Sequence, residues 1–210
     1  MHPLLRRLAL VLGLLLVLVV IVAAFARSRF RKSADTAVDL LTAIECGKGD
    51  QDACKDAHAS RVARCSRGDG QGCVLLGIEA ETGKFGAKND AEALRYFELA
   101  CNTKDPNGCW YFGTALARGK SQPKDEAKAV LAFQKGCDIG GDVNVCDSLG
   151  EAYEHGRGVN VDKARALTIY DRGCSFGKPG AMGFVCEHGK RLRAAQGTGA
   201  APAPSLAKPN

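Results

Sequence analysis

The chain has 210 residues, ten cysteines and a formal net charge of +6. Its length suits one ordinary domain or a short repeat array and excludes a multidomain enzyme. Residues 1–32 hold six of the 29 basic residues and no acidic residue, which leaves 23 basic against 23 acidic residues in the remainder. Because the remainder has no excess of basic residues to bind phosphates, we expect no nucleic-acid partner.

The N-terminal segment contains an unbroken apolar run over residues 8–25, preceded by two arginines. A membrane-spanning helix needs about 17 to 25 such residues, whereas the apolar part of a cleaved signal usually has about 7 to 15. We therefore expect residues 1–32 to be an uncleaved membrane anchor with basic flanks. The three residues that end at Ala26 also have the small-x-small spacing of a signal-peptidase site, so a signal peptide cleaved after Ala26 is the alternative.

The cysteine content sets the expected compartment. Ten cysteines in 210 residues far exceed what a reducing cytosol usually holds without a metal, whereas exported proteins keep disulfides. The basic residues on both sides of the apolar run mildly favour a cytoplasmic location for the remainder. We give the cysteines precedence and expect residues 33–210 to lie outside the cytoplasm; a cytoplasmic repeat protein with free thiols is the alternative.

The cysteines form five local pairs whose members lie 8, 8, 8, 9 and 12 positions apart. Zinc sites usually space paired ligands by two to four residues, and neither the cysteines nor the four histidines show that spacing; we predict no metal and no cofactor. Eight residues of continuous helix would separate two Cα atoms by about 12 Å, whereas a disulfide needs about 4.4–6.8 Å. Each bridged pair must therefore lie on either side of a bend, and the residues between the paired cysteines are of types that favour turns. The predicted disulfide residues are Cys46, Cys54, Cys65, Cys73, Cys101, Cys109, Cys137, Cys146, Cys174 and Cys186.

A repeat of about 36 residues is the strongest pattern in the chain. The second cysteine of a pair is followed four positions later by glycine at Gly77, Gly113 and Gly150, which are 36 and 37 residues apart. The same step relates three more sets, namely Ala93, Ala129 and Ala166; Phe97, Phe133 and Tyr170; and Cys101, Cys137 and Cys174. Apolar residues recur at helical spacing on both sides of a glycine-containing break. Each unit is therefore predicted to be a helix hairpin, and the units to stack as an α-solenoid.

The third unit resembles the Sel1-like repeat, a relative of the tetratricopeptide repeat. The residues that carry the resemblance are Leu149, Gly150, Tyr153, Gly156, Arg157, Gly158, Val159, Asp162, Ala164, Ala166, Tyr170 and Cys174. A cysteine after the second helix, followed by glycine and a further cysteine, is similar more specifically to the cysteine-rich Sel1-like proteins of bacteria, the Helicobacter cysteine-rich protein type. The resemblance covers about residues 66–190 and implies an all-α solenoid of disulfide-stapled hairpins in a bacterial protein. Together with the apolar run and the cysteine content, we expect this solenoid to follow an N-terminal transmembrane or signal helix and to face the periplasm or the outside.

The repeat fails at the front of the chain. Cys46 and Cys65 are 19 positions apart, as are Cys54 and Cys73, which leaves room for one helix and a turn rather than two helices. The pairing of these four cysteines therefore stays open. The expected segments are the anchor or signal at 1–32, an N-terminal helical cap at 33–65, the repeats with a C-terminal capping helix at 66–195 and a disordered tail at 196–210.

The resemblance also implies a link to penicillin binding and weak β-lactam hydrolysis. Ser121 with Lys124, and Ser205 with Lys208, satisfy the S-x-x-K pattern of serine β-lactamases. The first pair encloses a proline between repeat helices, the second lies in the tail, and no S-D-N or K-T-G companion is present. We therefore predict no catalytic residue and no enzyme; weak binding or hydrolysis of β-lactams or peptidoglycan fragments is the alternative.

Candidate binding residues lie on the first helix of each hairpin, because stacked first helices form a groove. Aromatic residues there either pack between layers or anchor a bound protein, and charged residues either line the groove or form a solvated face. The candidates are Glu79, Trp110, Tyr111, Arg118, Glu151 and Glu154. The predicted function is a non-enzymatic scaffold of the bacterial cell envelope that presents a rigid groove to an unidentified protein or peptide and is held to the membrane by residues 8–25.

Overall fold

The computed structural model describes residues 16–26, 42, 44–84, 86–140, 142–177 and 183–197. Throughout these ranges the regular elements are α-helices, so the predicted all-α solenoid is confirmed. The chain divides into two compact units, Met1–Ser60 and Arg61–Asn210, and the boundary falls inside helix α2 (Gln51–Ser66).

The first unit contains a helix at residues 16–26, a helical turn at residues 44–47 and the first part of α2. The turn and α2 are joined by the Cys46–Cys54 disulfide, and the Asp50 carboxylate accepts hydrogen bonds from the Asp52 and Ala53 amides at the start of α2. Among the described residues, no helix is both long enough and apolar enough to cross a bilayer. The predicted anchor and tail fall largely on residues 1–15, 27–32 and 198–210, which lie outside the described ranges.

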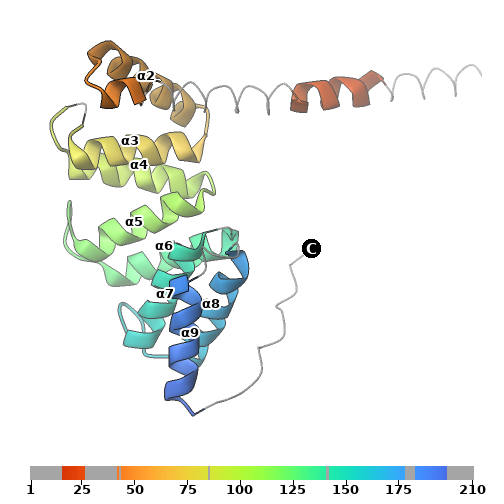
Figure 1. Ribbon diagram of the computed structural model, residues 1–210, viewed down its shortest axis with the longest axis vertical. Helices are drawn as coiled ribbons and strands as arrows, with labels where there is room; N and C mark the ends of the chain where they lie inside the picture. Colours follow the sequence, from red (N-terminus) through yellow and green to blue (C-terminus); the bar gives the residue numbers. More distant parts are fainter. Residues whose placement is uncertain are drawn as a thin grey trace, which may run out of the picture. The chain divides into compact units, whose positions relative to one another are not determined.

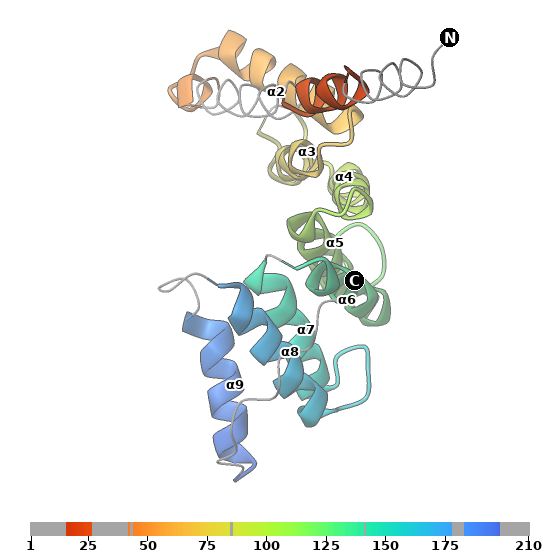
Figure 2. The ribbon, with the colours of Figure 1, turned by 90° about the vertical axis from the view of Figure 1, so that its right-hand side faces the viewer.

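The second unit is a series of helix hairpins that follow one another in chain order (Figures 1 and 2). The hairpins are α3 (Gly70–Thr82) with α4 (Asp90–Asn102), α5 (Pro106–Arg118) with α6 (Glu126–Ile139), and α7 (Val143–His155) with α8 (Lys163–Phe176), followed by α9 (Gly183–Ala195). Contacts also join α3 to α5, α5 to α7 and α7 to α9. The first helices therefore make one surface, which we call the first-helix face: α3, α5, α7 and α9.

Turn residues define the ends of these helices. A side-chain oxygen at the N-cap accepts a backbone N–H of the first turn, which satisfies a donor that the helix itself cannot. The N-cap residues are Asp69, Asn89, Asp105, Asp125, Asp142 and Asp162. Each first helix of a hairpin ends at a left-handed glycine, with φ of 70° at Gly83, 67° at Gly119 and 72° at Gly156, a conformation that other residues adopt only with strain.

Contact between a glycine and an aromatic ring closes each hairpin. A Cβ atom added at Gly77 would lie 2.3 Å from Cε1 of Phe97, and the corresponding distances are 2.5 Å for Gly113 with Phe133 and 2.4 Å for Gly150 with Tyr170. The glycines therefore let the rings lie directly against the first-helix backbone. This contact is the physical reason that glycine and an aromatic residue recur with the same step along the sequence.

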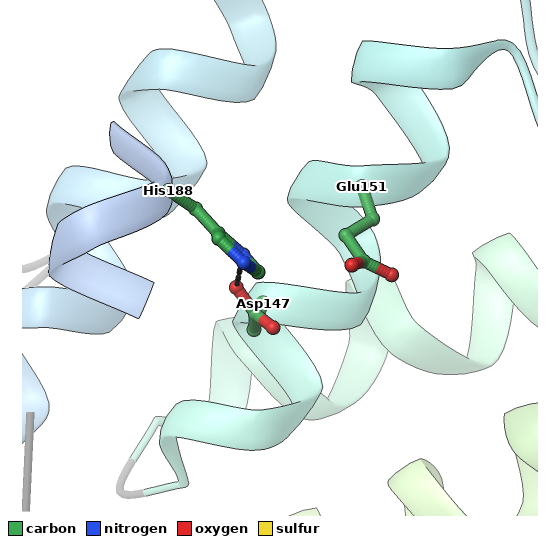
Figure 3. Close-up of side chains that lie close together, drawn as sticks. All are labelled: Asp147, Glu151 and His188. Carbon is green, nitrogen blue, oxygen red and sulfur yellow. Dashed lines mark hydrogen bonds and ion pairs between the residues drawn. The ribbon is translucent and has the colours of Figure 1, made fainter. Parts of the chain in front are cut away.

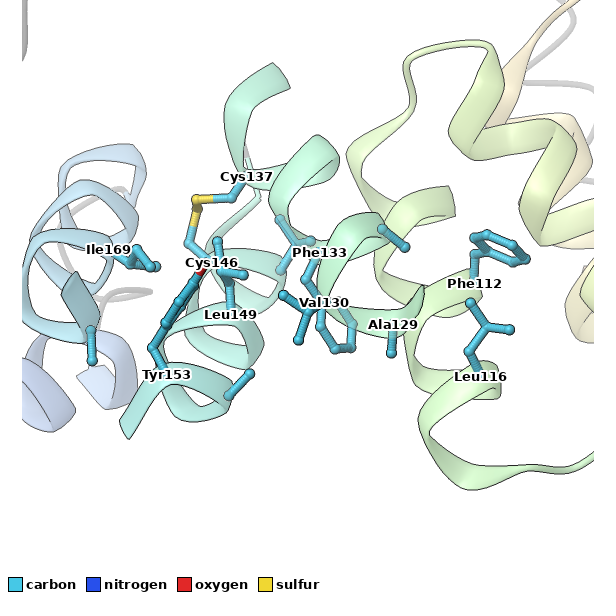
Figure 4. Packing of buried hydrophobic residues seen from close by; sticks show 14 of the residues in the cluster. Phe112, Leu116, Ala129, Val130, Phe133, Cys137, Cys146, Leu149, Tyr153 and Ile169 are labelled. Carbon is cyan, nitrogen blue, oxygen red and sulfur yellow. A yellow bond between two sulfur atoms is a disulfide. The ribbon is translucent and has the colours of Figure 1, made fainter. Parts of the chain in front are cut away.

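Disulfides join each hairpin to the next. Cys101–Cys109 links α4 to α5, Cys137–Cys146 links α6 to α7, and Cys174–Cys186 links α8 to α9. The pairing that the sequence left open is Cys46 with Cys54 and Cys65 with Cys73. The Cα atoms of the five bridges are 4.3–5.1 Å apart, and the described residues include no free cysteine. Figure 4 shows the Cys137–Cys146 bridge beside a continuous layer of buried side chains from α5, α6 and α7.

Helix α9 takes the place of a further first helix. A Cβ atom at Gly136 of α6 would lie 2.7 Å from Cys109 Cβ and 2.7 Å from Val145 Cγ2. The same addition at Gly173 of α8 would lie 2.9 Å from Cys146 Cβ and 3.0 Å from Val185 Cγ2. Val185 of α9 therefore packs on α8 as Val145 of α7 packs on α6, and the first-helix face continues in register to the end of the array.

Candidate functional site

A pocket of about 370 Å³ opens on the first-helix face between α5 and α7. Its base is apolar and comes from α6, where Ala129, Val130 and Phe133 are buried. Its walls come from α5, from α7 and from the loops that follow these two helices. The pocket thus combines an apolar base with a polar rim, as small-molecule and peptide sites commonly do.

Trp110 of α5 lines the pocket and links α5 to α7. Its Nε1–H donates a hydrogen bond of 3.1 Å to Ser148 Oγ, and its ring meets the Tyr111 ring edge-on with centroids 4.9 Å apart. The side chain is half-buried and packs against the core. The sequence left open whether this ring packs between layers or serves as a binding anchor. In the structure one part of the ring packs against the core and another part lines the pocket.

The charged groups of the pocket are mostly paired with one another. Arg157 donates to Glu151 Oε2 at 2.6 Å, and Lys124 Nζ lies 2.7 Å from Glu126 Oε1. Arg118, in the last turn of α5, is exposed, and within the described part of the chain no ion pair or hydrogen bond holds its guanidinium. The pocket therefore carries one uncompensated positive charge at its rim.

The other three candidate residues lie elsewhere. Glu79 does not line the pocket: it is 7% exposed and forms a buried ion pair with Arg61. Tyr111 stacks on Phe97 with ring centroids 4.9 Å apart, and burial, followed by the charge of Glu81, raises the pKa of its phenol. Its position between α3 and α5 is a packing position.

Glu154 lies between α7, α8 and α9 rather than at the pocket. Its carboxylate accepts a hydrogen bond of 2.8 Å from the Tyr170 hydroxyl and pairs with Arg191 at 3.2 Å. Burial, then the hydrogen bond to this carboxylate, raises the pKa of the Tyr170 phenol well above its usual value. The structure thus brings Trp110, Arg118 and Glu151 together and separates Glu154 from them.

A second group of polar side chains lies on the same face between α7 and α9 (Figure 3), and only Glu151 among its members was a candidate from the sequence. Asp147 and Glu151 are one helical turn apart on α7, and His188 of α9 places Nδ1 2.7 Å from Asp147 Oδ1. One potential ligand atom from each residue lies within 4.8 Å of the others. The i,i+4 pair of acids was visible in the sequence, but only the register of α9 against α7 brings the histidine to them.

The serine of the first S-x-x-K pattern is not set up as a nucleophile. Ser121 lies in the bend between α5 and α6 rather than on a helix, and the Lys124 ammonium is paired with Glu126. The second pattern, at 205–208, lies outside the described residues.

No protein-family model matches the sequence, and no curated protein matches it. Several solved structures are similar to this chain. A Sel1 repeat protein from Oxalobacter formigenes is 22% identical, with a TM-score of 0.55 over 63% of this chain and 96% of that chain. Helicobacter pylori cysteine rich protein B is 24% identical, with a TM-score of 0.53 over 66% and 96% of the two chains.

A protective antigen present in uropathogenic Escherichia coli strains, which displays an SLR fold, is 16% identical with a TM-score of 0.57. That match covers 75% of this chain but 36% of the antigen. Together the three similarities confirm the resemblance to the Sel1-like repeat fold, including its cysteine-rich form.

Proposed function

We propose that this protein is a non-enzymatic scaffold that binds a peptide segment of a partner protein at the pocket between α5 and α7. The observation that carries the proposal is the combination of Trp110, an apolar base and the uncompensated Arg118 in one pocket. An aromatic or aliphatic side chain would occupy the base, and a carboxylate beside it would pair with Arg118. Sel1-like repeat proteins are generally protein-interaction scaffolds, which supports the same class of function.

The disulfides favour binding because they hold the groove in one shape. Cys101–Cys109 and Cys137–Cys146 fix the starts of α5 and α7, the two helices that form the pocket walls. A wall that is already ordered loses less conformational entropy when a ligand binds. The same disulfides fit an oxidising, periplasmic or extracellular compartment, and we propose the cell envelope, with residues 8–25 as the membrane anchor.

Peptide selection followed by binding measurements would test this function. A displayed random-peptide library is selected on the oxidised, full-length protein in detergent, and the selected peptides are measured by fluorescence anisotropy. We expect enrichment of an apolar residue next to an acidic one. Arg118→Glu should weaken the binding of these peptides at least about tenfold, because it places like charges in contact, and amidation of the peptide carboxylate should have a similar effect on the unmodified protein.

Arg95→Glu is the matched control, because Arg95 is an exposed arginine on α4, away from the pocket. Equal losses for the two charge reversals, or no selected peptide that competes at the pocket, would contradict the proposal. Turnover of a chromogenic cephalosporin that follows the protein through purification and disappears in Ser121→Ala would instead establish the enzymatic alternative.

A further inference from the structure

Three side chains of types that bind metals meet on the first-helix face at the step from α7 to α9. His188 supplies an imidazole nitrogen, and Asp147 and Glu151 supply carboxylate oxygens, all within 4.8 Å of one another. Their side chains are 23%, 13% and 36% exposed respectively, so the group is partly sheltered but open to solvent on the Glu151 side. Imidazole nitrogen and carboxylate oxygen are both ligand types that bind Zn²⁺ and related divalent ions, and three-ligand zinc sites leave a fourth position to water.

Comparison with the other steps of the array shows that the equivalent places elsewhere hold no set of three potential ligands. Each first helix contains one cysteine. Two of the three places are the first and fifth residues after the cysteine of one first helix, and the third is the second residue after the cysteine of the next first helix. These places hold Val74, Ile78 and Tyr111 at the step from α3 to α5, and Trp110, Thr114 and Ser148 at the step from α5 to α7. The first set is an apolar cluster and the second lines the pocket. At the third step all three places change together to potential ligands.

The backbone and neighbouring side chains hold the three groups in position. The Cys174–Cys186 disulfide fixes α9 two residues before His188, and the His188 ring packs edge-on against Tyr170 with centroids 5.6 Å apart. Glu151 accepts from Arg157 through Oε2, which leaves Oε1 for a cation.

We propose that Asp147, Glu151 and His188 bind one divalent transition-metal ion of the zinc class. The ion binds Nδ1 of His188 in place of the present hydrogen bond to Asp147, with the ring proton on Nε2. Arg157 stays on the outer oxygen of Glu151 and orients that carboxylate, as second-layer partners of metal ligands do. The ion links α7 to α9 and places an open coordination position beside the pocket, but its binding does not depend on the proposed peptide function.

Calorimetric titration of the untagged, oxidised full-length protein with Zn²⁺ would test the site after removal of metals with a chelator. We expect one equivalent to bind, with Mg²⁺ binding much more weakly because imidazole is a poor ligand for it. Co²⁺ should give the visible absorption of a low-coordinate nitrogen and oxygen site. His188→Gln and Asp147→Asn should each weaken Zn²⁺ binding at least about tenfold.

His155→Gln and Glu187→Gln are the matched controls. His155 is an exposed histidine at the end of α7, and Glu187 is an exposed acid next to His188, and both variants should bind Zn²⁺ as the native chain does. Circular dichroism in chelator verifies that all four variants remain folded. The proposal is wrong if the native chain binds no Zn²⁺, if His188→Gln binds it undiminished, or if the control variants lose it equally. Each of these results leaves the peptide-binding test unaffected.

Discussion

Replacing Gly77 by alanine tests whether the glycine and aromatic contact sets the packing of a hairpin. The new Cβ would lie 2.3, 2.5 and 2.9 Å from three atoms of the Phe97 ring, all closer than real Cβ contacts allow. The ring has little space to move, because it is 1% exposed and stacks on Tyr111. Overpacking of this kind costs about 1–3 kcal/mol, and we expect the upper end of that range.

Helix propensity acts in the opposite direction, because alanine is about 1 kcal/mol more favourable than glycine inside a helix. The net loss of unfolding free energy should therefore be about 2 kcal/mol, which lowers the melting temperature by about 4–8 °C for a unit of this size. Thermal unfolding with the disulfides intact measures the shift. Gly86→Ala is the control, because nothing lies within 4 Å of that position. A Gly77→Ala variant that is as stable as the native chain, or more stable, would refute the reasoning.

Three other perturbations have outcomes fixed by single contacts. Replacing Cys137 and Cys146 together by alanine should lower the unfolding free energy by about 2–3 kcal/mol in the loop-entropy account, and urea unfolding measures the loss; a smaller change would mean that the repeat interface holds without its bridge. Tyr170→Phe should cost about 1–2 kcal/mol, because the 2.8 Å hydrogen bond to Glu154 is lost while the ring still packs; an unchanged melting temperature would show that the bond contributes nothing. Because burial raises the pKa of Asp147 above its ordinary value of 3.8, the stabilising contribution of its protonated form is fully present below pH 3.8 and is lost as the pH rises through the folded-state pKa. The stability of Asp147→Asn relative to the native chain should therefore increase as the pH rises above 3.8. Thermal unfolding in chelator measures this difference, and a difference that does not change with pH would contradict the prediction.

The hairpins could be predicted from the sequence because their packing requires particular residues at fixed places. A glycine must lie against an aromatic ring in each hairpin, and a cysteine must lie in the first turn of each new first helix. The repeat is therefore visible as identical or similar residues at a fixed spacing. Glu79 was a candidate groove residue because a single helix does not show which of its sides faces the core, and the structure buries its side chain. Its equivalents in the other first helices are Ala115, Ala152 and Leu192. Alignment of the repeats thus indicates an inward position, where a carboxylate needs the partner that Arg61 supplies.

The pocket and the three potential metal ligands could not be predicted in the same way, because they depend on contacts between successive first helices. Asp147 and His188 are 41 residues apart and meet only because α9 adopts the register of a first helix. No residue identity within one repeat indicates that contact. The signal lies in comparing equivalent places along the array, where apolar packing residues at the first step and pocket-lining residues at the second become ligand-type residues at the third.

The fold also explains how one face can carry such different groups. Within a hairpin the glycine and aromatic contact determines the packing, and between hairpins a disulfide holds the next first helix in place. The three compared places between successive first helices supply neither the glycine, nor the aromatic ring, nor the cysteine of these contacts. Those places are free to change from apolar, to the Trp110 pocket, to the group around Asp147, without loss of the contacts that specify the fold. Function can therefore differ from one step to the next along the array while the scaffold stays the same.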